Sequence, residues 1–281
     1  SSGSVVRAVV RGVGHYLPPR VVPNTEFEEK VDTTDEWIRT RTGIERRHFA
    51  AEGETTSSMA THAARAALDD AGVAIGEIDA IIVATSTPDL TFPSAASMVQ
   101  AQLGMTRGFA FDVQAVCAGF IYALVNANAL ILSGQAGRVL VIGAETFSRI
   151  LDWSDRSTCV LFGDGAGAVV LEKAEGDGSV ADRGILSSDL HSDGTYRDLL
   201  YVDGGVSTTG TAGVLKMQGN AVFRHAVEKL ADTAHTALAK VGLSGDDVDW
   251  IVPHQANLRI ISATAQRMGV PMDRVVVTVQ E

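Results

Sequence analysis

The sequence predicts an α/β fold in which strands and helices alternate along 281 residues. Short runs of apolar, β-branched residues are typical of strands buried on both faces, and segments of helical length lie between them. The composition agrees, because 46% of the residues are hydrophobic but only 6% are aromatic. Ala and Val therefore supply most apolar side chains, which suits helices packed closely on sheets. The length allows one large domain or two medium ones.

Strands and helices alternate through the first part of the chain. The predicted strands are Val5–Val13, Ala80–Thr85, Phe109–Val113, Val139–Gly143 and Ala168–Glu172. The predicted helices are Thr56–Ala71, Ser94–Leu103 and Cys117–Leu132. Ala80–Thr85 is almost continuously apolar, as expected of a strand covered on both sides. The alanines of Thr56–Ala71 recur on one helical face and predict the side that packs on a sheet.

A surface turn at residues 174–178 separates a second set of elements. We therefore expect two domains, 1–175 and 176–281. The predicted strands of the second set are Gly184–Leu190, Trp250–Pro253 and Val275–Val279, and its predicted helices are Ala221–Lys240 and Leu258–Met268.

The two sets resemble each other, which indicates a duplicated α/β unit. Residues 71–84 parallel residues 241–254, and residues 112–115 parallel residues 278–281. The duplication predicts that His254 ends a strand equivalent to the one ending near Thr85. It also predicts that the chain stops inside the counterpart of the loop that carries Cys117, so we expect a truncated C-terminal half.

Charge and composition exclude several classes of function. A net charge of −11 leaves no broad positive face for nucleic acid. Arg39, Arg41, Arg46 and Arg47 cluster locally, which indicates either one anionic ligand or a solvated charged turn. No Cys or His spacing indicates a zinc site, and no carboxylates are paired for glycoside hydrolysis.

Cysteine usage and hydropathy predict a cytoplasmic protein. Two cysteines cannot form a disulfide scaffold of the secreted type, so we expect both to be reduced. We find no apolar segment typical of a signal peptide or of a membrane span.

Cys117 is the most informative residue. It lies where a buried strand ends and a small-residue helix begins, and amide N–H groups at a helix start favour a thiolate. The flanking Ala118 and Gly119 leave room for a substrate carbon. The alternative is a small buried hydrophobe, which is how we interpret Cys159 in its apolar run.

Two further motifs are candidates for a functional role. His254, in His254-Gln255-Ala256-Asn257, follows a strand and is placed to manage protons near neutral pH, while Asn257 is also a natural N-cap for the next helix. The glycines of residues 163–167 resemble a dinucleotide-binding loop, but they precede a strand rather than a helix. A tight turn with close backbone packing explains them better.

Together these segments resemble β-ketoacyl-acyl carrier protein synthase III, the initiating condensing enzymes of bacterial fatty-acid synthesis, within the thiolase-fold superfamily. The resemblance covers about residues 5–281 and rests on motifs in a specific order, at residues 35–38 with 41–44, 117–120, 163–167 and 254–257. It implies a five-layer α-β-α-β-α architecture with two pseudo-symmetric halves, and a homodimer.

The resemblance implies a reaction and two catalytic residues. Cys117 would take an acyl group from coenzyme A, and His254 would assist decarboxylation of malonyl-acyl carrier protein. The family's third catalytic residue, an Asn, falls beyond Glu281, and Asn257 does not replace it. No tightly bound cofactor is implied, because acyl-coenzyme A is a substrate.

The resemblance also implies binding residues. Trp37 and Arg156 would hold the adenine of coenzyme A and Arg41 its phosphates, while Asn220 and Asn257 would follow the pantetheine channel. The residues implied to meet the carrier protein are Arg259, Arg224 and Arg267. Phe92 and Phe162 are implied at the acyl pocket, with Phe92 reaching across the dimer to cap the pocket of the partner subunit. The alternatives are a core or helix-start aromatic for Trp37 and solvated surface for the arginines.

Two other functions remain open at this point. One is a secondary-metabolite condensing enzyme or acyltransferase of the same fold with other acceptors. The other is a non-catalytic partner subunit; such subunits replace the nucleophile, so retained Cys117 and His254 count against it.

Overall fold

A computed structural model describes residues 3–281 and divides into two compact units. The first unit contains the segment that ends at Pro19, together with Ala50–Thr146 and Asp164–Ser188. The second unit contains Arg20–Phe49, Phe147–Gly163 and Asp189–Glu281. The division into pseudo-symmetric halves at 1–175 and 176–281 stays a prediction.

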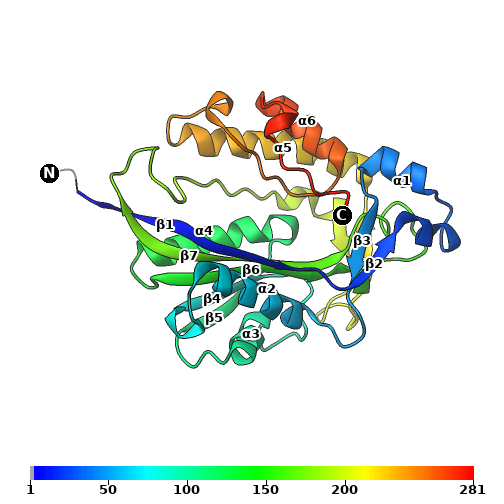
Figure 1. Cartoon of the computed structure of the whole chain (residues 1–281). Coiled ribbons are helices and arrows are strands. Elements are labelled where there is room, and N and C mark those ends of the chain that lie inside the picture. Colours follow the sequence, from blue (N-terminus) through cyan, green and yellow to red (C-terminus); the bar gives the residue numbers. More distant parts are fainter. Residues whose placement is uncertain (1–2) are drawn as a thin grey trace. The chain divides into compact units, whose positions relative to one another are not determined.

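The first unit is built on a five-stranded mixed sheet in the order β1-β7-β6-β4-β5. Its strands are β1 (Val5–Tyr16), β4 (Ala80–Ala84), β5 (Phe109–Val113), β6 (Arg138–Thr146) and β7 (Asp164–Gly176). Strand β4 runs parallel to β5 and β6, whereas β7 is antiparallel to β6 and β1 (Figure 1). Three neighbouring strands, β5, β4 and β6, therefore end at the same edge of the sheet.

Helices cover both faces of this sheet. Helices α2 (Thr56–Ala71) and α3 (Ala95–Leu103) lie on one face and α4 (Gly119–Leu132) on the other (Figure 1). Side chains of a strand alternate between faces, so Ile81 and Val83 join the core under α2 and α3 while Ile82 joins the core under α4. All of β4 is buried, as its apolar run predicts.

Local sequence explains the bounds and the close packing of α2. The helix begins with a capping box between Thr55 and Ser58 and ends at Gly72 in the left-handed conformation. Its small residues allow β1 to approach closely, because a Cβ added at Gly14 would lie 2.3 Å from the backbone nitrogen of Ala67. Glycine in β1 is therefore a packing requirement.

The second unit combines three α-helices with two short strand pairs and long connecting segments. Its helices are α1 (Asp35–Thr42), α5 (Gly219–Ala239) and α6 (Leu258–Met268). Its strands form two short antiparallel pairs, β2 (Arg20–Pro23) with β3 (Arg46–Phe49) and β8 (Leu200–Val202) with β9 (Leu215–Met217). Short 3-10 helices over both units are Asn24–Glu29, Ile75–Glu77, Val116–Ala118, Phe147–Arg149, Gly194–Leu199, Gly245–Asp247 and Met272–Arg274.

Most predicted elements are confirmed. Thr56–Ala71, Phe109–Val113 and Leu258–Met268 have the predicted bounds, and the remaining predicted helices differ only near their ends. Strand β7 is longer than predicted, since it begins at Asp164 rather than Ala168 and includes Gly165 and Gly167. The prediction of a tight turn at these two glycines was therefore wrong.

Three predicted strands of the second set are not formed. Gly184–Leu190 contains no strand, and Gly184 has a φ of 113° that interrupts an extended run. Trp250–Pro253 and Val275–Val279 are reduced to a single parallel bridge between Ile251 and Val275. A strand needs a continuous ladder of hydrogen bonds, and here only the bonds beside Ile251 are made. Within residues 3–281, no helix is long and apolar enough to cross a bilayer.

Candidate active site

In the first unit, three chain segments with polar or nucleophilic side chains meet at one edge of the sheet. Ala84 of β4 pairs with Val113 of β5 on one side and Gly143 of β6 on the other. Such a group lies at or just beyond the end of each strand. Cys117 follows β5, the segment Thr85–Thr87 follows β4, and Glu145 is near the end of β6. Ligands of α/β sheets bind at the carboxyl ends of the strands, which makes this edge the candidate site.

Cys117 is held by an unusual backbone turn. It lies in the 3-10 turn Val116–Ala118 directly before α4. Val116 has a φ of 50°, in the left-handed region that β-branched residues rarely adopt. Such strain persists where the surrounding structure imposes it and is concentrated at functional sites. Gly119 continues the turn against β4, since a Cβ there would lie 3.4 Å from the Cβ of Ala84.

The electrostatics around Cys117 differ from the prediction. Cys117 is exposed to solvent. Burial nevertheless raises the pKa of its thiol, and the charge of Glu145 raises this pKa further. Solvent reaches the residue, but the surrounding protein removes part of the hydration that a thiolate needs. The expected bias toward thiolate from the helix start is outweighed here.

Glu145 is a site residue that the motifs did not reveal. Its Oε1 accepts a hydrogen bond from the Ser86 amide at 2.7 Å, and its Oε2 accepts one from Thr87 Oγ1 at 2.6 Å. Burial raises the pKa of the Glu145 carboxyl from 4.5 to about 7, against the lowering effect of these hydrogen bonds. The available signal was a lone carboxylate ending an otherwise apolar strand.

His254 lies in a segment of the second unit that is held in place by hydrogen bonds of the next residue, Gln255. Gln255 donates through Nε2 to the carbonyl oxygens of Pro253 and Val276, both at 3.0 Å, and accepts from the Thr278 amide at 2.8 Å. Burial lowers the pKa of His254 below its usual 6.5. The imidazole is therefore neutral at physiological pH. Asn257 caps α6, as predicted, through bonds to the next helical amides.

The structure brings Trp37, Arg41 and Arg156 together in the second unit. The Cζ atoms of Arg41 and Arg156 lie 4.5 Å and 5.3 Å from the centroid of the Trp37 ring. Arg156 is also held by the Asp32 carbonyl oxygen at 2.6 Å. Trp37 itself lies in the first turn of α1, where its amide donates to the N-cap Thr34. This cluster offers a flat aromatic surface with two cations.

The remaining predicted residues are placed as follows. Asn220 and Arg224 line an open cavity of about 340 Å³ at the start of α5. Arg259 Nη2 donates to the Thr40 carbonyl oxygen at 3.3 Å, and Arg267 lies in the last turn of α6. The Phe162 ring packs on Phe147 in the second unit, with centroids 5.3 Å apart. Phe92 belongs to the first unit and is 81% exposed.

The predicted basic cluster is mostly not available for a ligand. Arg39 pairs with Asp35, and Arg46 pairs with Glu281. Arg47 is buried, where it donates to the carbonyl oxygens of Val22 and Val160. Burial lowers the pKa of Arg47 to about 10. Of the four arginines, Arg41 is the one that lies over the Trp37 ring. Cys159, predicted to be structural, is fully buried.

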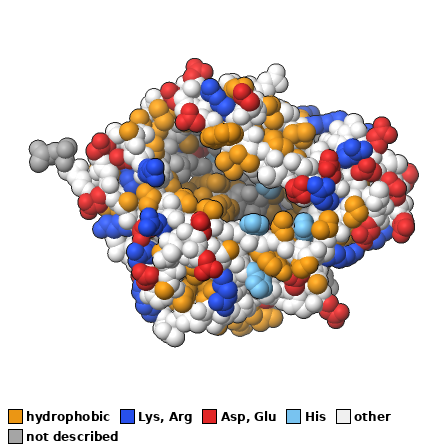
Figure 2. Space-filling model, in the orientation of Figure 1, with side chains coloured by type: hydrophobic (Ala, Val, Ile, Leu, Met, Phe, Trp, Pro, Cys, Tyr) orange, Lys and Arg blue, Asp and Glu red, His pale blue; other side chains and the backbone are white. Residues whose placement is uncertain are grey.

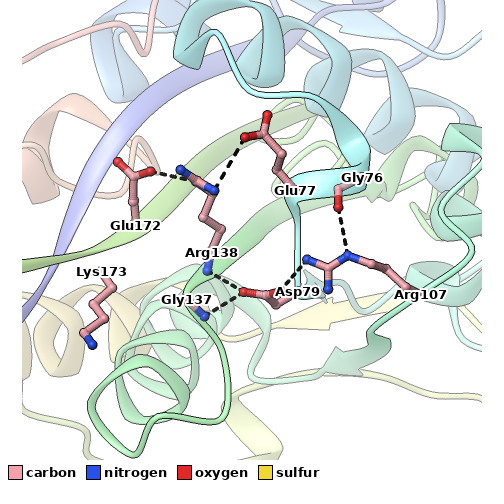
Figure 3. Close-up of a pocket in the computed structure, with 8 residues that line it drawn as sticks. All are labelled: Gly76, Glu77, Asp79, Arg107, Gly137, Arg138, Glu172 and Lys173. Carbon is pink, nitrogen blue, oxygen red and sulfur yellow. Dashed lines mark hydrogen bonds and ion pairs between the residues drawn. The ribbon is translucent and has the colours of Figure 1, made fainter.

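A polar cavity of about 480 Å³ lies at the other end of these strands, where β4 and β6 begin (Figure 3). Asp79, which directly precedes β4, accepts from the amides of Gly137 and Arg138 and from the Arg107 guanidinium. Arg138 is paired in turn with Glu172 at 2.6 Å. These paired charges fasten strand ends to one another, so we interpret the cavity as structural.

One face of the molecule can be compared with the expectation that no broad positive surface is present. On the face shown in Figure 2, acidic and basic side chains are interspersed, with hydrophobic side chains between them. Among residues 3–281, no group of three His, Cys, Asp or Glu side chains is arranged to hold a metal ion. The candidate groups are a thiol and a buried carboxyl group in the first unit and a neutral imidazole in the second.

Two family models match this sequence. The model for 3-oxoacyl-(acyl-carrier-protein) synthase III matches residues 111–194, and that for its C-terminal part matches residues 238–281. A β-ketoacyl-(acyl-carrier-protein) synthase III of Rhodobacter capsulatus is 78% identical over 276 residues, which cover 98% of this chain and 85% of the relative.

Solved structures agree. A 3-oxoacyl-(acyl-carrier-protein) synthase III of Aquifex aeolicus superposes with a TM-score of 0.90 at 45% identity, over 98% of this chain and 85% of that one. The priming β-ketosynthase of a polyketide biosynthetic pathway superposes with a TM-score of 0.87 at 38% identity, over 98% and 81%. The predicted thiolase-like α/β fold is confirmed by these superpositions.

Proposed function

This chain belongs to the 3-oxoacyl-(acyl-carrier-protein) synthase III family, and we propose that it catalyses the condensation that initiates fatty-acid synthesis. It is an acyltransferase that joins a short acyl group from acyl-coenzyme A to the two-carbon unit of malonyl-acyl carrier protein. The products are carbon dioxide, free coenzyme A and a 3-oxoacyl-acyl carrier protein. The observation that carries the proposal for this site is Cys117 on a strained turn at the carboxyl ends of three parallel strands.

The first half-reaction uses Cys117 as the nucleophile. Its thiol loses a proton, the sulfur attacks the thioester carbonyl of acyl-coenzyme A, and the coenzyme A thiolate leaves and takes up a proton. The open turn beside Ala118 and Gly119 admits the carbonyl carbon, because these residues add almost no side-chain bulk. The raised pKa of the Cys117 thiol means that the free protein stores a neutral thiol, which is less prone to oxidation than a thiolate.

The second half-reaction uses His254. The malonyl carboxylate leaves as carbon dioxide, and its bonding electrons form an enolate whose carbon attacks the acyl-Cys117 thioester. A carbon–carbon bond forms, the carbon–sulfur bond breaks, and the released thiolate takes up a proton. A neutral imidazole can donate a hydrogen bond to the enolate oxygen without holding the carboxylate as a cation would. Burial keeps His254 in that neutral form.

Substrate binding follows from the second unit. We propose that Trp37 and Arg156 hold the adenine of acyl-coenzyme A, that Arg41 binds its phosphates, and that Asn220 and Asn257 contact the pantetheine arm. The docking site for the acidic carrier protein would consist of Arg259, Arg224 and Arg267. The acyl pocket would include Phe92 and Phe162.

We also propose a homodimer formed through β5. This strand is at the edge of the five-stranded sheet and carries the 39% exposed Phe109. Exposed apolar edge strands are sites of strand pairing unless they are covered. Leu90 and Phe92, in the loop before α3, are also exposed, at 51% and 81%. Two free thiols and acyl-coenzyme A as substrate favour a cytoplasmic location.

The test is the intact mass of the protein before and after incubation with acetyl-coenzyme A, alongside Cys117→Ala. One acetyl group on the wild type that is absent from the variant supports the assignment. An acetyl group that persists in Cys117→Ala would show that another residue is the nucleophile. Addition of malonyl-acyl carrier protein should then remove the acetyl group with release of carbon dioxide.

A second candidate is priming of a polyketide pathway, favoured by the likeness to the priming β-ketosynthase. The two functions differ in the acyl group that is preferred and in the carrier protein that is accepted. A panel of acyl-coenzyme A donors of increasing length, tested with carrier proteins from both kinds of pathway, separates them. A non-catalytic partner subunit would show no acetyl group on Cys117 with any donor.

A further inference from the structure

Glu145 occupies a position that the proposed reaction does not yet explain. It lies on β6, two residues beyond Gly143, which pairs with Ala84 of β4. Ala84 pairs in turn with Val113, four residues before Cys117. A carboxyl group is therefore built into the same sheet edge as the proposed nucleophile, and its charge adds to the effect of burial in raising the pKa of the Cys117 thiol.

The hydrogen bonds around Glu145 are arranged for a carboxylate. Thr87 Oγ1 accepts from the Thr146 amide at 2.8 Å, and Thr85 Oγ1 accepts from the Thr87 amide at 3.1 Å. Each hydroxyl therefore directs its own hydrogen to Glu145, at 2.6 Å from Thr87 and 3.3 Å from Thr85. With the Ser86 amide, three donors point at one side chain, and these donors stabilise its ionised form.

These contacts have two consequences. They fasten the segment Thr85–Thr87, which leads directly into the loop that carries Phe92, to the end of β6. They also oppose the effect of burial on the pKa of Glu145, so that above about pH 7 the side chain carries negative charge on the same sheet edge as a thiol that must become a thiolate to react. If Glu145 served packing alone, replacing it by an amide would leave the reactivity of the Cys117 thiol unchanged. If its charge acts on the thiol, the same replacement changes the pH at which the thiol reacts.

We propose that Glu145 is a positioning residue for the reaction of Cys117, holding the segment Thr85–Thr87 in place and setting the fraction of Cys117 that is thiolate in the free protein. This proposal rests on the proposed function, in which Cys117 is the nucleophile. Removal of the Glu145 charge makes the free thiol more reactive, and acyl transfer then begins from a larger thiolate population.

The other charged groups near Glu145 have partners of their own. Asp89, in the loop after β4, accepts from the amide and the hydroxyl of Ser57 at the start of α2. Asp164 of β7, which pairs with Thr146, accepts from the Ala50 amide at 2.7 Å. On residues 114–118, which connect β5 to α4, the titratable side chain is Cys117. Asp89 thus offers a matched control, because it fastens the same loop without acting on the thiol.

The experiment measures the rate at which iodoacetamide alkylates Cys117 between pH 6 and 10, with Cys117→Ala as the background for the buried Cys159. In Glu145→Gln, the rate curve should shift to lower pH, and the rate at pH 8 should rise roughly three- to fivefold, as loss of one nearby charge predicts. Glu145→Asp keeps the negative charge and should therefore leave the rate curve close to that of the wild type. Asp89→Asn should leave the curve in place.

Two results would overturn the proposal: an unchanged curve in Glu145→Gln, or an equal shift in Asp89→Asn. If Glu145→Gln does not fold, Thr87→Val removes one donor to the carboxylate and should shift the thiol curve in the same direction, and no shift there counts against the proposal. Alkylation reports on the thiol whether or not it takes an acyl group. A wild type that alkylates normally but accepts no acyl group from any donor of the panel would therefore refute the proposed function, while the alkylation curves would still show whether Glu145 sets the thiolate fraction of Cys117.

Discussion

Replacing Glu145 by Gln should change how the stability of the first unit depends on pH. Burial raises the pKa of this carboxyl from 4.5 to about 7 in the folded protein. The folded state therefore holds a proton that the unfolded chain has already lost in this range, so stability is greatest below pH 4.5 and falls as the pH rises to about 7. One unit of pKa corresponds to about 1.4 kcal/mol.

The difference of about 2.5 between these two pKa values predicts a loss of roughly 3 kcal/mol by pH 8. The glutamine side chain of the variant carries no charge, but it cannot accept from both hydroxyl groups and the Ser86 amide as the carboxylate does. Losing such bonds to a charged group costs roughly 1.5–3 kcal/mol. At pH 8 the variant should thus be more stable than the wild type by up to about 1.5 kcal/mol, and near pH 5 it should be less stable.

The assay is urea unfolding of the wild type and Glu145→Gln at pH 5, 6, 7 and 8, followed by circular dichroism. The difference in free energy of unfolding between the two proteins should change sign across this range. Asp89→Asn serves as the control for general weakening of the loop. Parallel pH curves for the wild type and Glu145→Gln would refute the reasoning, because the carboxyl would then titrate alike in both states.

Three further substitutions test the site and the packing. Replacing His254 by Ala should slow condensation roughly 10²–10³-fold while leaving acetylation of Cys117 largely intact, measured by carbon dioxide release and intact mass; equal loss of both steps would contradict the division of roles. Trp37→Ala should raise the KM for acetyl-coenzyme A roughly tenfold with little change in kcat. The comparison is Trp153→Ala, at a tryptophan of the same unit whose ring packs on Phe27 and Phe49, and an unchanged KM in Trp37→Ala would remove Trp37 from the binding surface. Gly14→Ala should lower the free energy of unfolding by about 1–3 kcal/mol or more, measured by thermal unfolding, because the added Cβ would lie 2.3 Å from the Ala67 backbone nitrogen; a wild-type melting temperature would show that β1 and α2 can separate at no cost.

The pattern of apolar residues was sufficient for the first unit's elements. Strand β4 is buried on both faces and α2 has a capping box and a terminal glycine, so each segment carries its own local signal. The strands predicted for the second set are not formed, for the opposite reason. Trp250 and Val252 have strand-like sequence, but they are 64% and 76% exposed and lack a ladder beyond the bridge at Ile251. A strand depends on its neighbours, and sequence alone does not supply them.

What the sequence determined by itself is the set of residues in short, ordered motifs: Cys117 between strand and helix, His254 before a helix cap, and Trp37 beside Arg41. These features are local, so residue type and spacing are enough to find them. The tertiary structure alone decided which charges surround them. Arg47 is withdrawn into the core by two carbonyl oxygens from distant segments. Glu145 reaches the edge that carries Cys117 only because β6, β4 and β5 run parallel in register, and its effect depends on burial and on donors from the segment that follows β4. Electrostatics act through space between segments far apart in the chain, and therefore appear only once the fold is formed.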